Sequence, residues 1–236
     1  MKFNITTNKE LDVEVTGWFF EGGSRVIQDF WPEIQVASDI PRVIEAEYGE
    51  ALYEKITLLQ DNVGKLDLIA GAISEVIDEE WSPIDTISIW VGTCPIAPRF
   101  LDNYSFLMPY YHDLNYMIST SAHEMIHFLY FKKWAKLFPK HQVSRFESPD
   151  PVWVLSEILV SIIGNDDRIK NIVGSKFEVY PNWMNTRIAG QTVTGPFEKI
   201  YANSNTFDDF LKKSWVKYQD LDKQHNITEK LASNPF

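Results

Sequence analysis

The sequence predicts an α+β fold, in which a small mixed sheet with an edge strand lies beside one long helix and a mainly helical C-terminal lobe follows. Three observations predict it. The N-terminal half contains apolar and β-branched runs with the two-residue period of strands. Residues 113–137 contain neither Gly nor Pro, which favours one long helix. Beyond residue 150, apolar runs are bounded by helix start and stop signals.

The first elements are predicted from periodicity. Apolar and polar side chains alternate over residues 2–20, so we expect two strands joined by a polar turn near Asn8 and ended by the glycine pair at 22–23. Helical spacing over 42–60 and 65–80 predicts two helices. The segment IDTISIWVG, residues 84–92, is β-branched and apolar, which predicts a buried strand.

The segment NYSFLMPYYH, residues 103–112, is aromatic-rich and predicts an extended strand. Pro109 cannot donate to a ladder, so we expect this strand at an edge of the sheet. The long helix follows, with Asp113 or a nearby residue as its cap and Pro139 just beyond its end.

Two further helices are expected in the C-terminal region. Asp150 fits an N-cap and Pro151 the first helical position of a helix that runs to Gly164. Another helix is expected over 206–221. We expect an N-terminal lobe over residues 1–138 and a C-terminal helical lobe over 139–236, which together form one catalytic unit.

Composition limits the possible functions. Aromatic residues make up 14% and the hydrophobic set 44% of the 236 residues, so the chain can bury a core. A net charge of −11 argues against binding to nucleic acid or to an anionic membrane. The single cysteine, Cys94, excludes an internal disulfide. Without a signal-like or membrane-spanning apolar run, the expected location is the cytoplasm.

The segment STSAHEMIHFLYF, residues 119–131, carries the strongest functional signal. Side chains four apart share a helix face, so His123 and His127 can bind one metal ion. Glu124 projects about 100° further round the helix, where it can reach a water molecule without binding the metal. Zinc lowers the pKa of its water to about 7, and a carboxylate can then take the proton.

A structural explanation of Glu124 competes with this one. Ser121 and Glu124 are three residues apart, as in a capping box, so a helix that began at Ser121 would explain the glutamate without catalysis. The preceding residues LNYMIST contain no helix breaker, however, and supply apolar side chains for packing. We therefore expect the helix to begin earlier.

The third ligand distinguishes the classes of metal site. Tyr130 and Lys133 stand where a metzincin would have a glycine and its third histidine, which excludes that class. Glu157 is the strongest candidate, because it lies within the apolar helix VWVLSEILVSIIG, where an unpaired buried carboxylate is costly. The alternatives are His141 as ligand, or an ion pair of Glu157 with one of three arginines: Arg145, Arg168 or Arg187.

These residues resemble the pattern of the gluzincin metallopeptidases, which have HExxH on one helix and a glutamate ligand on the next. The similarity is to the minimal thermolysin-like core and spans roughly residues 84–165. It implies a zincin-like fold, one Zn²⁺ ion held by His123, His127 and Glu157, and Glu124 as general base. Ser161 departs from the pattern, because many members have an aspartate there that orients a ligand histidine.

Three other residues are candidates for stabilising an oxyanion, since the resemblance implies a tyrosine or histidine beyond the glutamate ligand. Tyr180 is the first choice, and Tyr201 and His225 are the alternatives. Cys94 would be a ligand in a peptide deformylase, but VGTCPIAP lacks that family's context, so a buried structural cysteine is expected. His112 could touch substrate, although a solvent-facing histidine at a strand end is the default interpretation.

The expected function is a zinc-dependent metallopeptidase that hydrolyses peptide bonds of a peptide or protein substrate. The segment 103–112 would pair with an extended substrate through backbone hydrogen bonds. The alternative is a zinc-stabilised binding module with a zincin fold and no turnover, in which Glu124 would have no role. A helical structural protein without metal is a third possibility.

Overall fold

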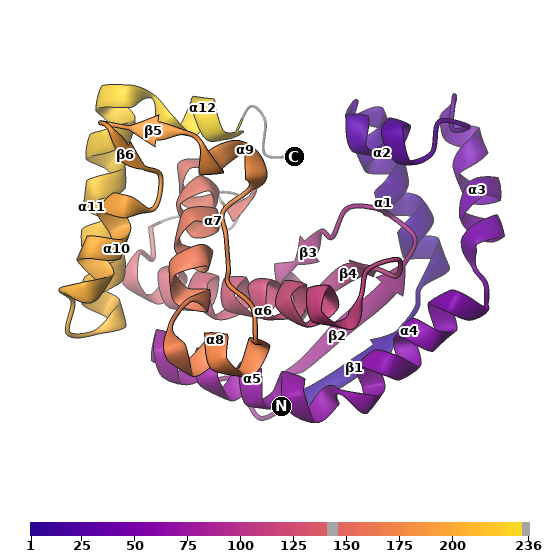
Figure 1. Cartoon of the computed structure of the whole chain (residues 1–236), viewed down its shortest axis with the longest axis horizontal. Coiled ribbons are helices and arrows are strands. Elements are labelled where there is room, and N and C mark those ends of the chain that lie inside the picture. Colours follow the sequence, from indigo (N-terminus) through magenta and orange to yellow (C-terminus); the bar gives the residue numbers. More distant parts are fainter. Residues whose placement is uncertain (141–145, 233–236) are drawn as a thin grey trace. The chain divides into compact units, whose positions relative to one another are not determined.

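The structure is a computed structural model of the whole chain, in which residues 1–140 and 146–232 are described (Figure 1). The chain separates into two compact units. The first unit contains residues 1–68 and 82–124, and the second unit contains residues 69–81 and 125–236. In the described part of the chain, no helix combines the length and the apolar character that crossing a membrane requires.

The first unit contains a four-stranded mixed sheet with the order β1-β2-β4-β3 (Figure 1). Strands β1 (Lys2–Thr6), β2 (Thr86–Gly92) and β4 (Ser105–Pro109) are parallel, and the short β3 (Arg99–Phe100) is antiparallel to β4. The strand predicted at 84–92 is confirmed as β2, one of the two inner strands of the sheet. The α+β class with a small mixed sheet is likewise confirmed.

The second N-terminal strand was predicted wrongly, because a helix, α1 (Lys9–Glu21), follows β1. Asn8 caps this helix by accepting a hydrogen bond from the Leu11 N–H at 3.1 Å. The Asp12 carboxylate in the first turn is fully buried and accepts hydrogen bonds from the N–H groups of Thr93 and Cys94. These capping and tertiary hydrogen bonds outweigh the alternating pattern.

The remaining helices of the N-terminal region are α2 (Arg25–Phe30), α3 (Ile40–Glu47), α4 (Glu50–Asp61) and α5 (Val63–Ile77), with 3₁₀ turns at Ala37–Asp39 and Leu101–Asn103. The helix expected over 42–60 is therefore two helices, interrupted at Tyr48 and Gly49. The helix expected over 65–80 is confirmed as α5.

The strand β4 does not lie at the edge of the sheet, contrary to the prediction for 103–112. It lies between β2 and β3, and its Leu107 N–H donates to the Pro98 carbonyl at 3.0 Å. Pro109 is tolerated because it is the last residue of the strand, and the next N–H, that of Tyr110, donates to the Gly92 carbonyl. The edge next to β4 is instead formed by β3.

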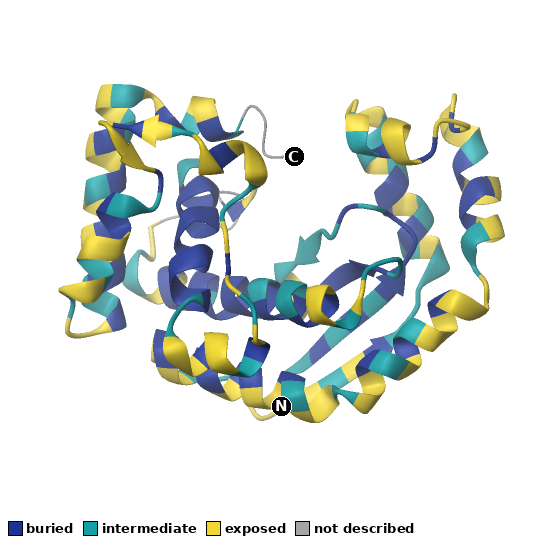
Figure 2. Ribbon diagram, viewed as in Figure 1, coloured by how far each residue is buried: buried dark blue, intermediate teal, exposed yellow. Residues whose placement is uncertain are grey.

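Two long helices carry the predicted site residues. The helix α6 (Leu114–Leu137) is capped by Asp113, whose Oδ1 accepts from the Tyr116 N–H at 2.9 Å, as predicted. The helix α7 (Pro151–Gly164) begins with Asp150 as its N-cap, which also confirms the prediction. Figure 2 shows α7 as buried along nearly its whole length, consistent with its apolar sequence.

The rest of the second unit is mainly helical. It contains α8 (Asp167–Val173), α9 (Pro181–Met184), a hairpin of β5 (Arg187–Ile188) and β6 (Gln191–Thr192), α10 (Gly195–Ala202), α11 (Phe207–His225) and α12 (Ile227–Ala232). The helix predicted over 206–221 is confirmed as α11 and extends one turn further.

Candidate metal centre

The HExxH segment lies in the interior of α6. Ser121 is buried in the third turn of that helix, and its hydroxyl donates to the Met117 carbonyl at 2.8 Å. Because Ser121 has a full helical turn before it, it cannot be an N-cap, and the capping-box explanation of Glu124 is wrong.

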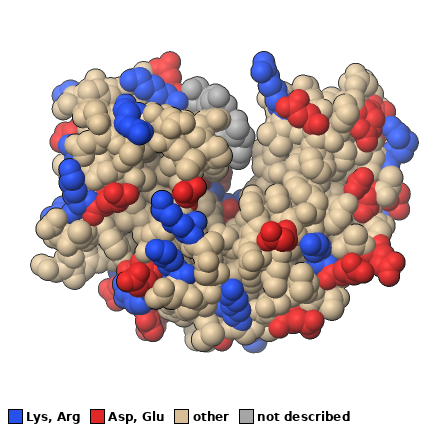
Figure 3. Space-filling view, in the orientation of Figure 1, with Lys and Arg blue, Asp and Glu red and all other residues tan. Residues whose placement is uncertain are grey.

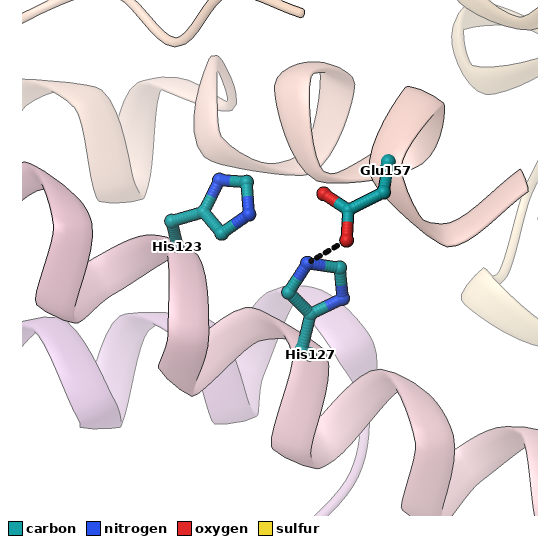
Figure 4. Close-up of side chains that lie close together, drawn as sticks. All are labelled: His123, His127 and Glu157. Atoms are coloured by element: carbon teal, nitrogen blue, oxygen red, sulfur yellow. Dashed lines mark ion pairs between the residues drawn. The ribbon is translucent and has the colours of Figure 1, made fainter. Parts of the chain in front are cut away.

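Three side chains of ligand type converge between α6 and α7 (Figure 4). One ligand atom from each of His123, His127 and Glu157 lies within 4.8 Å of the other two. The closest pair is His127 Nε2 and Glu157 Oε1, which are 3.2 Å apart. His127 is fully buried and Glu157 is 3% exposed, whereas His123 is half-buried. Within the described residues, this is the one such group of three or more His, Cys, Asp or Glu side chains.

The geometry and chemistry of this group fit a zinc ion. Zinc binds imidazole nitrogens and carboxylate oxygens at about 2.0–2.2 Å in a tetrahedron, so its ligand atoms lie about 3.3 Å apart. The 3.2 Å between His127 Nε2 and Glu157 Oε1 is close to that spacing, and the ligand atoms of all three residues lie within 4.8 Å of one another. The three residues could therefore hold one ion and leave a fourth position open.

Two of the three arginines proposed as partners of Glu157 have other contacts. Arg168 forms an ion pair with Asp166 at 2.8 Å. Arg187 is exposed and donates to the main-chain carbonyls of Met184 and Thr186. Arg145 and the alternative ligand His141 lie outside the described residues.

Ser161, at the position of the aspartate in the gluzincin pattern, does not use its hydroxyl to orient a histidine. Its hydroxyl is buried and donates to the Ile158 carbonyl within α7 at 2.8 Å. The His127 ring is oriented partly by packing, because it stacks on Phe131 at 5.8 Å between centroids and 12° between planes.

Glu124 is buried next to an arginine. Its side chain is 7% exposed, and its Oε2 lies 4.0 Å from Nη1 of Arg99, whose side chain is 9% exposed. Arg99 comes from β3, at the edge of the sheet. Sequence reasoning missed this residue, although a single charge in the apolar stretch CPIAPRFL was a signal that something must compensate it.

Among the oxyanion candidates, Tyr201 already uses its hydroxyl in another contact. The Tyr201 hydroxyl donates to Asp166 Oδ2 at 2.6 Å, and burial together with this hydrogen bond raises the Tyr201 pKa. The Tyr180 ring packs edge-to-face on Trp183 at 5.0 Å. His225 is the half-buried last residue of α11. A catalytic role for Tyr180 stays a prediction.

Cys94 is a buried structural residue, as expected. Its N–H donates to Asp12 Oδ1 at 2.9 Å, and burial raises the pKa of its thiol to about 12. The thiolate that a metal ligand requires is therefore disfavoured. Lys133, at the metzincin ligand position, donates to the Asp78 carbonyl and to Asp208 Oδ1 at 2.7 and 2.8 Å.

His112 is half-buried, so the expectation of a solvent-facing side chain was only partly correct. Its ring stacks on Tyr116 with the centroids 3.7 Å apart, and burial lowers its pKa.

Comparisons of the chain with protein-family models, with curated proteins and with solved structures find no match. What the site can do must therefore be inferred from its own residues.

Proposed function

We propose that the chain is a zinc-dependent metallopeptidase of the gluzincin type with a zincin-like fold. The observation that carries the proposal is the convergence of His123, His127 and Glu157 within 4.8 Å, with a glutamate directly after the first histidine. A His–Glu ion pair alone would account for two of these side chains. It would not account for a second imidazole on the same side of α6.

In this proposal, His123 and His127 from α6 and Glu157 from α7 hold one Zn²⁺. Zinc bound there would polarise the scissile carbonyl and lower the pKa of a nearby water molecule. Glu124 removes a proton from that water as its oxygen bonds to the carbonyl carbon, and the carbonyl electron pair moves to the carbonyl oxygen. When the C–N bond breaks, Glu124 returns the proton to the amine nitrogen.

The proposed substrate is a peptide in an extended conformation. Since β4 is covered by β3, the strand available for backbone pairing is β3, which is antiparallel to β4 and ends the sheet on that side. Because β3 has only two residues, Arg99 and Phe100, pairing would be short and side-chain contacts would contribute much of the affinity.

The proposal is tested by zinc content and by cleavage of a peptide library. Purified protein should contain about one zinc per chain. Glu124→Gln should keep the zinc and the fold while activity falls by about two to four orders of magnitude, because only the base is removed. Glu14→Gln, at an exposed position on α1, is the matched control and should cleave normally.

Other outcomes contradict the proposal in distinguishable ways. Stoichiometric zinc without cleavage of any peptide would favour the binding module without turnover. Absence of zinc would favour a structural protein. Normal cleavage by Glu124→Gln would leave a peptidase whose base is another residue.

A further inference from the structure

We propose that Arg99 is a catalytic residue that stabilises the negative charge on the carbonyl oxygen of the substrate during hydrolysis. This inference rests on the proposed peptidase function and assigns to one arginine the role that the sequence suggested for Tyr180, Tyr201 or His225.

The position of Arg99 is the first argument. It lies on β3, the strand at the sheet edge, and pairs in register with the buried Phe106 of β4. Its guanidinium reaches Glu124 on α6, with Nη1 4.0 Å from Oε2. A substrate that pairs with β3 and is attacked next to Glu124 would therefore pass the guanidinium.

The chemistry of the guanidinium is the second argument. Both side chains are at least nine-tenths buried, so the attraction between them is screened less than at the surface. A guanidinium has five N–H donors and stays charged, so Arg99 can attract Glu124 and also donate to a substrate oxygen.

The movement of charge during the reaction is the third argument. Before attack, the negative charge lies on Glu124. As Glu124 accepts the proton from water, that charge is neutralised, and an equal charge appears on the former carbonyl oxygen of the substrate. The Arg99 guanidinium can then interact with the oxyanion in place of the neutralised carboxylate. Its interaction with the substrate is therefore stronger in the transition state than in the ground state.

The lysines of α6 that the structure describes make ion pairs away from Glu124. Lys133 contacts Asp78 and Asp208 near the C-terminal end of the helix. Lys132 and Lys136 both pair with Glu79. The Tyr201 hydroxyl, a neutral alternative, donates to Asp166.

The first experiment measures the kinetics of zinc-loaded full-length variants on a peptide that is amidated at its C-terminus. Arg99→Met should lower kcat by about 10²–10³-fold, the usual effect of losing one oxyanion donor, with KM changed less than about threefold. Arg99→Lys keeps the charge and should recover part of kcat. Arg42→Met removes the same charge from an exposed position on α3 and should leave both constants unchanged.

The second experiment separates a contact with substrate from an effect through Glu124. In a Glu124→Gln background, which is expected to bind peptide and cleave it only slowly, Arg99→Met should weaken binding of a peptide phosphonate, a tetrahedral anion, by about 100-fold. Binding of the uncleaved peptide of the same sequence should weaken by less than about threefold. Thermal unfolding and zinc content establish that each variant is folded and loaded.

Three results would overturn the assignment. Equal weakening of phosphonate and peptide would mean that Arg99 contributes only to ground-state binding. An unchanged phosphonate affinity in the Glu124→Gln background would mean that Arg99 acts only by positioning Glu124. An effect on kcat confined to peptides with a free C-terminal carboxylate would make Arg99 a carboxylate anchor. Failure of the peptidase proposal is recognised separately, because the unmodified protein would then cleave no peptide.

Discussion

Three buried carboxylates of this chain differ in what surrounds them. Asp12 accepts hydrogen bonds from the N–H groups of Thr93 and Cys94 and from the Thr93 hydroxyl. Glu124 faces a guanidinium and Glu157 faces an imidazole. Main-chain donors cannot leave without unfolding the backbone, so Asp12 is structural. An imidazole can bind a metal ion in place of a carboxylate, and a guanidinium can donate to an oxygen of a substrate instead. Glu124 and Glu157 are therefore suited to a functional site.

This difference predicts opposite effects of removing two of these carboxylates. Glu157→Ala should lose most of the bound zinc, because two histidines alone bind the ion weakly. Asp12→Asn should keep the zinc but lower the free energy of unfolding by about 2–4 kcal/mol, since an amide nitrogen would face buried N–H donors. Metal analysis and urea unfolding of both variants measure the two effects. Full zinc occupancy in Glu157→Ala would exclude this ligand and make His141 the next to test.

At the scale of elements, α7 depends on its last residue as well as on Glu157. A Cβ atom on Gly164 would overlap the ring of Phe177, whose main chain is held by two hydrogen bonds with Asn165 at 2.7 and 3.1 Å. Because those bonds hold Phe177 against the end of the helix, the ring cannot easily move away. Packing against Phe177 therefore explains why the last residue of EILVSIIG is a glycine.

Gly164→Ala should destabilise the protein by about 1–3 kcal/mol through overpacking. The matched control is Gly71→Ala on α5, where the position is exposed and a Cβ atom would meet no atom within 4 Å. That control should stabilise the protein by up to about 1 kcal/mol, because alanine favours a helix more than glycine does. Chemical unfolding of both variants checks the prediction, and equal effects of the two substitutions would contradict it.

The helices α8 and α10 are linked by Asp166, and the link predicts a dependence of stability on pH. Hydrogen bonds from Arg168, and then from Tyr201, lower the Asp166 pKa from 3.8 to about 2. Because the pKa of Asp166 is lower in the folded than in the unfolded state, its ionised carboxylate stabilises the protein at pH values above the unfolded-state pKa. This stabilisation is lost as the pH falls towards 2. Asp166→Asn should therefore cost about 1 kcal/mol near pH 7, after discounting for partial exposure, and progressively less below pH 4. Urea unfolding across that range measures the difference, and a cost independent of pH would contradict the assigned cause.

Elements with local signals were predictable from the sequence, and those set by distant contacts were not. Asp113, Asp150 and Pro151 mark the starts of α6 and α7 in the sequence itself. The alternating residues of α1 also fit a strand, and the helix is favoured by the Asn8 cap together with the distant hydrogen bonds of Asp12 to Thr93 and Cys94. The pairing of β3 with β4 had no local signal because β3 is so short.

The same distinction applies to the site. His123, Glu124 and His127 lie within five consecutive residues of one helix, so periodicity alone places them. Glu157 could be chosen because a carboxylate is conspicuous in an apolar helix. Arg99 lies 25 positions before Glu124 in the chain, and only the folded sheet brings the two together.

On the scale of the whole molecule, the charge is strongly negative but not segregated on the face in view. In Figure 3, basic and acidic side chains are interspersed on that face, and no continuous basic patch is visible there. The net charge of −11 gives no reason to expect a polyanionic partner. It favours attraction of cations, including the zinc ion that the candidate site would take.

Binding of that ion should stabilise the whole protein, because the complete ligand set exists only when α6 and α7 are folded. A ligand that binds the folded state alone adds about 2.7 kcal/mol at a free concentration 100 times its Kd. For a chain of 236 residues, this corresponds to an increase in Tm of about 5–10 °C. Calorimetry with buffered zinc and with a chelator should show this increase in the unmodified protein and in Glu124→Gln, which keeps every ligand. Glu157→Ala should unfold at the same temperature in both buffers. If the Tm of the unmodified protein were also the same with zinc and with the chelator, a metal site built from these residues would be excluded.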